Sequence, residues 1–410
     1  MSSGDRMKKD RKSIRTLILV LGGIAAIGPF SIDMYLPGFA GIAGEFNTGI
    51  GAVGYTLTAY LAGICFGQLV YGPLTDRYGR KTPLLAGLAI YIISSAGCAL
   101  AGGIQSLIIM RLFQALGGCV GMVACRAIVR DRFPVSLVAK VFSSLMLVMG
   151  AAPIIAPILG GAVIAASGWR SIFWILTAFG VFLFILAYRL LQESKTPDPS
   201  VSLHPARVAR NYFEVLKNRE FLIYGLASSF LSAGLMAYIS GSPGVFMKLF
   251  GLTERQFGWL YAANAFGLIA GSQLNHILLK RSTSGRISLI AAAAQLAAAV
   301  LLTAAALYVE YTRAPFYILV FLCLAMCGIL NPNTTALALK PMERSAGSAS
   351  AMLGFMQTTA GALASLAVGA LHNGTALPMA AVMAAVSLTG VLLLLIAKFS
   401  NISERRALQA

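Results

Sequence analysis

The chain has 410 residues, of which 58% are hydrophobic and only 11% charged, and its mean hydropathy is +0.79. A soluble protein of this length needs far more charge on its surface, so the composition excludes a soluble domain and indicates a protein embedded in lipid. The net charge of +18 does not indicate a nucleic-acid partner, because most basic residues lie in short breaks between apolar runs.

The N-terminus is basic and is followed by an apolar run from Ile14. No small-residue cleavage site follows, so we expect a retained first helix rather than a signal peptide. A membrane-spanning helix needs about 20 apolar residues. Twelve such runs are expected near residues 14–36, 52–74, 82–103, 106–129, 138–166, 170–191, 220–247, 255–279, 286–309, 315–338, 346–371 and 377–398.

The loops between these runs predict the orientation. With both termini in the cytoplasm, 26 of the 32 Lys and Arg residues lie inside and four outside, as the positive-inside rule requires. We therefore expect an all-α membrane protein with twelve transmembrane helices in two six-helix bundles. Its parts are a basic cytoplasmic N-terminus (1–13), an N-terminal bundle (14–191), a cytoplasmic linker (192–219), a C-terminal bundle (220–398) and a cytoplasmic tail (399–410).

The linker contains three prolines and then a basic stretch. Val208, Tyr212, Phe213 and Leu216 recur there at helical spacing, and they would give a helix an apolar face on the inner leaflet. A solvated connector is the alternative.

A weak internal repeat relates the two halves. Pro37-Gly38 ends the first run, and Pro243-Gly244 lies in the seventh. The second and eighth runs share a spacing of small and amide residues: Gly63, Gly67 and Gln68 against Gly267, Gly271 and Gln273. Parallel halves of this kind bind substrate between them, near the middle of the membrane.

The segment GPLTDRYGRK, which begins at Gly72, follows the second run. Glycine permits a tight turn at Gly79 and a close approach at Gly72. The Asp76 carboxyl lies within reach of Arg77 and Arg80, and it could also dock on the positive N-terminus of another helix and hold one conformation closed. The segment resembles the signature loop of the major facilitator superfamily; the alternative is an ordinary basic turn.

Further segments resemble the Bcr/CflA drug-resistance branch of the twelve-helix drug:proton antiporters. These are SIDMYLP at residues 31–37, the Arg111–Gln114–Gly117 spacing of the fourth helix, RDRFP at 130–134, APILGG at 156–161 and GWRSIFW at 168–174. Residues 156–161 resemble the exporter motif of the fifth helix, in a degenerate form. The resemblance implies a major facilitator fold, a small-molecule substrate and export driven by protons.

Asp33 is the expected proton carrier. An acid within a span costs about 2.5–3.5 kcal/mol to insert at mid-helix, so it usually faces protein or water and has a function. Its affinity for a proton depends on its surroundings, which alternating access changes. The alternative is an interfacial residue near the outer boundary.

Arg111 is the expected companion, at a comparable depth in the outer half of the fourth helix. It lies too far from water to snorkel, so we expect it to meet a carboxylate, a carbonyl or an occluded water. The resemblance assigns it to proton coupling; a structural tie between helices is the alternative. Arg126 lies about 22 Å further along an ideal helix, so it cannot share one small site with Arg111, and its role stays open.

The fifth helix carries two prolines and two adjacent glycines that predict a bent, closely packed helix. They are Pro153, Pro157, Gly160 and Gly161. Such a helix suits a seal between the halves, although a kink without a gating role would have the same sequence.

Six polar residues are candidates for the substrate cavity: Tyr35, Gln114, Tyr238, Asn264, Asn331 and Gln357. Met122, Met146 and Met149 would add adaptable apolar surface. Taken alone, each of these residue types is more often part of the packed core than a substrate contact.

The expected function is proton-coupled efflux of small amphiphilic drug-like molecules across the bacterial inner membrane, by a monomer. The expected partners are the substrate, protons and the lipid bilayer. No nucleotide loop, nucleophile elbow or metal-ligand cluster occurs, so we expect no enzyme activity and no cofactor or metal. Two alternatives are export of an endogenous metabolite, such as an amino acid, small peptide or siderophore, and a receptor or scaffold that does not transport.

Overall fold

The computed structural model describes residues 3–132, 135–199, 205–308 and 313–407. Within these ranges, the side chains of 3–15, 126, 130, 135–150, 205–208, 211, 343–348 and 400–407 lie outside the description. The interpretations that concern Arg126, Met146, Met149 and Val208 therefore fall outside the described residues.

Every regular element in the described part of the chain is helical. The elements of the first half are α1 (Ser3–Asp33), η1 (Leu36–Gly38), α2 (Phe39–Glu45), α3 (Ile50–Arg77), α4 (Lys81–Ala99), α5 (Ile104–Arg132), α6 (Val135–Ser167) and α7 (Arg170–Leu190). The later elements are α8 (Pro205–Leu216), α9 (Arg219–Ser242), η2 (Pro243–Leu249), α10 (Glu254–Leu278), α11 (Ser284–Leu307), α12 (Ala314–Leu339), η3 (Lys340–Ser345), α13 (Ala346–Ala370) and α14 (Leu377–Ala407).

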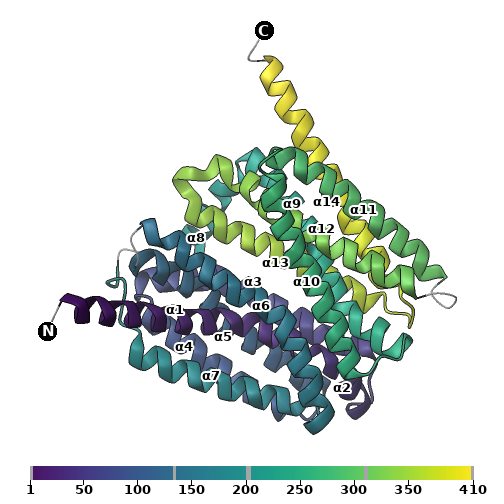
Figure 1. Cartoon of the computed structure of the whole chain (residues 1–410), viewed down its shortest axis with the longest axis horizontal. Coiled ribbons are helices and arrows are strands. Elements are labelled where there is room, and N and C mark those ends of the chain that lie inside the picture. Colours follow the sequence, from purple (N-terminus) through teal and green to yellow (C-terminus); the bar gives the residue numbers. More distant parts are fainter. Residues whose placement is uncertain (1–2, 133–134, 200–204, 309–312, 408–410) are drawn as a thin grey trace.

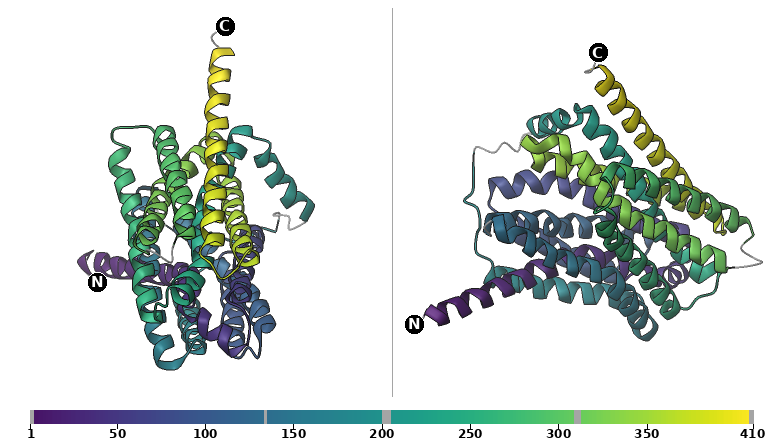
Figure 2. Two further views of the ribbon diagram at one scale, coloured as in Figure 1. Left: turned by 90° about the vertical axis from the view of Figure 1, so that its right-hand side faces the viewer. Right: turned by 45° about the horizontal axis from the view of Figure 1, so that its top comes forward.

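The helices form two groups, one before α8 and one after it (Figure 1). The groups meet along α3 with α13 and along α6 with α10. Their axes converge near α2 and diverge toward α8, and the last turns of α14 extend beyond the rest of the molecule (Figures 1 and 2). Contacts between the two groups are therefore concentrated toward the α2 end.

Ten helices in the described residues are long and apolar enough to cross a membrane. Ala151–Ser167 of α6 is a shorter apolar stretch, and α10, with its amide side chains, is not among the ten. The ten spans establish a multi-pass membrane protein. The count of twelve and the direction of insertion stay predictions.

Both proline–glycine pairs of the repeat lie where a long helix changes form. The first helix ends at Asp33, not at residue 36, and continues after a turn as the short η1 at Leu36–Gly38. In the second half, α9 ends at Ser242 and Pro243 begins the π-helical η2. Proline cannot donate the helical hydrogen bond, so both helices lose their regular ladder at these points.

The repeated glycines pack corresponding helix pairs together. A Cβ at Gly63 would lie 2.5 Å from the Leu112 carbonyl oxygen of α5, and one at Gly271 would lie 2.1 Å from the Ala325 carbonyl oxygen of α12. The helix pairs α3–α5 and α10–α12 thus approach closely for the same reason: no side chain separates their backbones.

The linker helix α8 packs on the second half of the protein. Val215 is buried, and Tyr212 and Leu216 pack around it against α9 and α13. Phe213 is 61% exposed. Two of the four residues predicted for the apolar face, Tyr212 and Leu216, therefore pack partly on protein.

Candidate functional site

Asp33 is the last residue of α1 and lies on the seam between the two halves. Its side chain is buried, with 4% exposed. Oη of Tyr261, on α10 of the other half, donates a hydrogen bond of 2.7 Å to its Oδ1. No ion pair of Asp33 occurs among the described residues. A tyrosine of the opposite half is thus the polar partner that the structure gives this carboxyl.

Aromatic packing fixes the ring of Tyr261 within the second half. It stacks on Tyr238, with ring centroids 5.6 Å apart, and contacts Phe257 at 6.0 Å. Nδ2 of Asn264 donates to Oη of Tyr238 over 2.9 Å. Tyr238 and Asn264, both predicted cavity residues, are therefore buried behind Tyr261 rather than exposed.

Arg111 is fully buried in the first half and is held by neutral acceptors. Its Nη1 donates to the Ser31 carbonyl oxygen (2.9 Å) and to Oε1 of Gln114 (2.7 Å). Gln114 in turn donates from Nε2 to Oγ of Ser95, over 2.8 Å. The residue thus meets a carbonyl, one of the three partners expected from its depth, and the predicted cavity residue Gln114 serves to hold it.

Three aromatic rings surround the Arg111 guanidinium. Its Cζ lies 4.2 Å from the ring centroid of Tyr60, 4.5 Å from Tyr35 and 5.8 Å from Phe173. Cation–π attraction is strongest where the cation is desolvated, as it is here. Tyr35, a further predicted cavity residue, is 1% exposed and also hydrogen-bonds to Thr56 through its hydroxyl.

Asp33 and Arg111 form no ion pair in the described structure, although the sequence predicted that they act together in proton coupling. Asp33 bonds to the second half, whereas Arg111 ties α5 to the backbone of α1 within the first half. Nε and Nη2 of Arg111 have no hydrogen-bond partner among the described residues. Asp33 and Arg111 therefore belong to two separate polar networks. Each network includes one residue near the end of α1: Asp33 itself in the first, and Ser31 in the second.

The glycines of α6 close the seam beside Asp33. A Cβ at Gly160 would lie 2.1 Å from the carbonyl oxygen of Met34, and one at Gly161 would lie 2.6 Å from that of Glu254 on α10. From the other side, a Cβ at Gly258 would lie 2.7 Å from the Pro157 carbonyl oxygen. Backbones of the two halves are thus in direct contact, which is the close packing that the sequence predicted for α6.

The second seam runs between α3 and α13. The hydroxyls of Thr58 and Ser365 lie 3.1 Å apart, and Thr359 donates to Sγ of Cys65 over 3.6 Å. Near the α2 end of the molecule, a Cβ at Gly51 would lie 3.2 Å from the carbonyl oxygen of Gly369.

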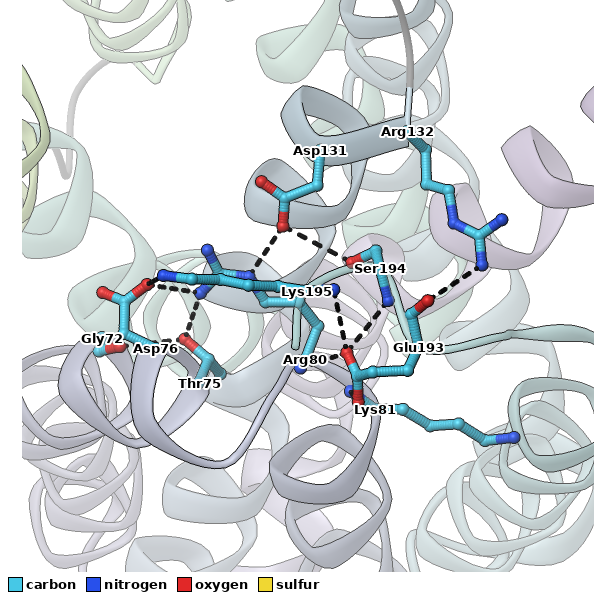
Figure 3. Close-up of polar contacts among 10 residues, drawn as sticks. All are labelled: Gly72, Thr75, Asp76, Arg80, Lys81, Asp131, Arg132, Glu193, Ser194 and Lys195. Atoms are coloured by element: carbon cyan, nitrogen blue, oxygen red, sulfur yellow. Dashed lines mark hydrogen bonds and ion pairs between the residues drawn. The ribbon is translucent and has the colours of Figure 1, made fainter. Parts of the chain in front are cut away.

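The signature loop runs from the last turns of α3 to the start of α4, and the centre of its polar contacts is the buried Arg80 (Figure 3). Nη1 of Arg80 donates to Oδ1 of Asp76 and Nε to Oδ2 of Asp131, each over 2.9 Å. Gly79 has a φ of +82°, so it makes the tight turn predicted from the sequence. Lys195 of the linker also donates to Asp76, over 2.8 Å.

Glu193, which the sequence analysis missed, is the anion at the helix terminus of this loop. Its two carboxylate oxygens accept from the backbone N–H groups of Arg80 and Lys81 at the start of α4, over 2.6 and 3.1 Å (Figure 3). A negative charge is stabilised there by the free N–H groups and by the helix dipole. Asp76, expected as a candidate for such a position, pairs with Arg80 and Lys195 instead.

Gly72 of the signature loop and the last two predicted cavity residues, Asn331 and Gln357, are less buried than the other four predicted cavity residues. The nearest atom to a Cβ at Gly72 would be the Tyr212 hydroxyl at 3.9 Å, so the predicted close approach at Gly72 is wrong. Asn331 is exposed and Gln357 half-buried. Gln357 donates to Thr335 (3.5 Å), which donates to Asn331 (3.3 Å), so the structure joins these two predicted cavity residues.

Asn331 lies on α12 between the side that contacts α9, through Thr334 and Ser228, and the side that packs on α10, through Gly328 and Leu268. An exposed amide is costly in lipid, so we expect Asn331 to face water or protein.

The arrangement is that of a helical membrane transporter with two halves and polar groups at their seam. The profile of the Major Facilitator Superfamily matches residues 21–365. The chain is 34% identical over 382 residues to an uncharacterized MFS-type transporter, YdgK, of Bacillus subtilis, covering 92% of this chain and 94% of that one. It is 29% identical over 395 residues to the bicyclomycin resistance protein homolog of Haemophilus influenzae, covering 96% and 99%.

Two further comparisons agree with these. The chain is 32% identical over 330 residues to the multidrug transporter MdfA of Escherichia coli, with 79% of each chain covered. The solved structure of a D-xylose-proton symporter superposes with a TM-score of 0.75 at 14% identity, over 93% of this chain and 97% of that one, and shows the shared fold. The chain belongs to the Major Facilitator Superfamily and resembles its drug:proton antiporter branch; it is a membrane transporter, not an enzyme.

Proposed function

We propose that the protein exports small amphiphilic drug-like molecules across the bacterial inner membrane in exchange for protons. The observation that carries this proposal is the Asp33 carboxyl, which is buried on the seam between the halves with a tyrosine of the other half as its hydrogen-bond partner. The names of its relatives, a bicyclomycin resistance protein homolog and a multidrug transporter, support the choice of substrate class.

Alternating access accounts for the exchange. When the halves rock apart at the α2 end, Asp33 leaves Tyr261 and meets water, so its affinity for a proton changes between the two conformations. Each charge that crosses the membrane potential supplies about 2.3 kcal/mol per 100 mV, which is enough for a gradient of tens-fold. Two halves, residues 14–191 and 220–398, would move as bodies joined by the linker.

The contacts between the halves bear on the conformation. The hydrogen bonds Asp33–Tyr261 and Thr58–Ser365 and the close contact of Gly161 with Glu254 join the halves. At the other end, the described ion pairs around Arg80 stay within the first half and the linker. With the basic loop face in the cytoplasm, as the positive-inside rule indicates, these contacts support an inward-facing state.

Arg111 has a supporting role in this mechanism. Its bond to the Ser31 carbonyl ties α5 to α1 two residues from Asp33, and Gln114 of the same helix holds the guanidinium. It provides a permanent positive charge near the carboxyl without neutralising it by contact. Asn331 and Gln357 offer uncharged donors and acceptors to the substrate, consistent with a neutral or cationic amphiphile rather than an anion.

Proton flux in proteoliposomes tests the proposal. Purified wild type, Asp33→Asn and Glu45→Gln are challenged with chloramphenicol and with tetraphenylphosphonium. Glu45 is the matched control, because its carboxylate pairs with Arg170 of the same half. We expect drug addition to release protons with wild type and Glu45→Gln, and Asp33→Asn to bind drug without proton release.

Other results would redirect the assignment. Proton-coupled transport by Asp33→Asn at the wild-type rate would remove Asp33 as the carrier. Uptake of neither drug, together with proton release on adding a peptide or amino acid, would indicate a metabolite exporter. Binding without any proton movement in the wild type would indicate a receptor.

A further inference from the structure

Tyr261 is the one residue of the second half whose side chain is described in a hydrogen bond with Asp33. Both side chains are buried, with 4% of each exposed, and the donor–acceptor distance is 2.7 Å. A hydroxyl donating to a carboxyl in such surroundings is among the stronger hydrogen bonds in proteins. The bond also crosses between the two bodies that alternating access separates.

The second half holds the Tyr261 ring rigidly. Tyr238 stacks on one side and Phe257 packs nearby, while Asn264 fixes the Tyr238 hydroxyl. Movement of the second half therefore carries the Tyr261 hydroxyl with it. Rotation of the tyrosine alone, which would keep the bond as the halves part, is opposed by this packing.

The backbone seal encloses the bond. Met34, next to Asp33, is covered by Gly160, and Gly258, one helical turn before Tyr261, touches the Pro157 carbonyl. Asp33 is 4% exposed in this arrangement. The contact of Gly258 with Pro157 and the hydrogen bond of Tyr261 with Asp33 both cross between the halves, so parting the halves here would separate both.

We propose that Tyr261 is a positioning residue of the transport cycle: its hydroxyl holds the Asp33 carboxyl on the seam and couples proton binding there to opening of the α2 end. The proposal rests on the function of Asp33 proposed above. By linkage, if only the closed conformation supplies this donor, protonation of Asp33 shifts the equilibrium between the two conformations. Tyr261 then transmits the proton's effect to the whole second half.

The experiment measures opening directly, in the full-length chain. Spin labels are attached at Ala40 and Arg255, exposed positions on the two halves at the α2 end. The six native cysteines are buried, which favours selective labelling of the two introduced ones. Distances between the labels are recorded by pulsed electron paramagnetic resonance across a pH series, for the wild type, Tyr261→Phe, Tyr238→Phe and Asp33→Asn.

Tyr238→Phe is a close match for Tyr261→Phe. Both remove one hydroxyl from the same aromatic stack, but the Tyr238 hydroxyl bonds to Asn264 within its own half. We expect the pH midpoint of the distance change to move by about one pH unit in Tyr261→Phe, the size expected for losing one hydrogen bond to a carboxyl. Tyr238→Phe should keep the wild-type midpoint, and Asp33→Asn should lose the transition that Tyr261→Phe shifts.

Equal behaviour of Tyr261→Phe and Tyr238→Phe, whether both shift or neither does, would overturn the proposal. So would a difference in label distance between Asp33→Asn and the double variant of Asp33→Asn with Tyr261→Phe, since the two residues should act through one bond. Failure of the proposed function gives a different result: Asp33→Asn would still release protons on drug addition in proteoliposomes, whatever the distances show.

Discussion

The carboxylate of Glu193 occupies the space that a side chain at Gly79 would need. A Cβ on Gly79 would lie 2.6 Å from Oε2 of Glu193, and the same carboxylate caps the first N–H groups of α4. One glycine therefore serves two purposes: it adopts the left-handed turn, and it leaves room for the acidic residue that ties the linker to the signature loop.

Gly79→Ala should destabilise the protein more than an alanine at another left-handed glycine. Alanine at positive φ costs about 1–2 kcal/mol, and displacement of the Glu193 cap adds about 1 kcal/mol. Gly374 is the control, because it has φ +80° and no atom within 4 Å of its Cβ position. Thermal unfolding in detergent should show a larger drop in Tm for Gly79→Ala; equal drops would mean that Glu193 moves aside freely.

Asp131→Asn should cost more stability than Asp76→Asn. Both carboxylates pair with the buried Arg80, but the Asp131 side chain is 18% exposed and that of Asp76 is 42% exposed. Removing the less solvated partner leaves more of the guanidinium charge uncompensated, at a cost of about 1–3 kcal/mol, against less than about 1 kcal/mol for the exposed pair. Tm values at low and high salt check this order; a larger loss in Asp76→Asn would contradict it.

What the sequence could predict here depends on how far apart the interacting residues lie along the chain. The turn at Gly79 and the glycine packing of α3 and α10 follow from local pattern, since spacing within one helix determines which residues share a face. The positions of Asp33 and Arg111 along their predicted helices placed them at a comparable depth. All of these features are visible within a window of about one helix.

The partners of those residues could not be predicted in the same way. Tyr261 lies 228 positions from Asp33, and Glu193 lies 113 positions from Arg80. Tyr261 and Asn264 share a face of α10 at a spacing of three, which is a weak signal that many buried helices carry. Only the packing of the two halves shows whether a tyrosine contacts an acid or fills the core. Four predicted cavity residues are in fact buried, which could not be predicted because the sequence does not show how the helices pack around them.

Gly161→Ala and Gly160→Ala should have different effects although they are adjacent. Gly161 faces the Glu254 backbone of the second half, so a methyl group there should disfavour the closed seam and increase the open population. Gly160 faces Met34 within the first half, so its methyl group should lower Tm instead. Gly44→Ala, a helical position with nothing within 4 Å, should be neutral or slightly stabilising. Spin-label distances and Tm separate the two effects; similar profiles for both variants would contradict this division.

Arg111→Lys should not be a conservative change. Lysine keeps the charge but cannot reach the Ser31 carbonyl and Gln114 with the same planar group, and it loses stacking with Tyr60 and Tyr35. We expect a loss of about 1–3 kcal/mol in stability and at least a tenfold loss of transport. Arg170→Lys, at a partly exposed arginine that also lies over a ring, should lose less. Wild-type transport by Arg111→Lys would show that charge alone suffices.

The closed seam at the α2 end should weaken in acid through His372. This residue follows α13 and lies against the other half: its Cβ would be 3.2 Å from a Cβ on Gly51. Burial, and then the charge of Lys248, lower the pKa of His372 below its usual value of 6.5. A histidine whose pKa is depressed by folding contributes stability above its unfolded pKa, and this contribution is lost as the pH falls through its folded pKa.

The test compares His372→Gln with His276→Gln, which changes an exposed histidine of α10. In the wild type and in His276→Gln, the Tm should fall and the population with the longer label distance should grow as the pH falls from about 7.5 to below about 6. The reason is that His372 binds a proton more readily where the seam is broken than where it is closed. His372→Gln should lose much of this pH dependence. If its Tm and label distances follow the wild-type curve, the acid sensitivity of the seam originates in another group.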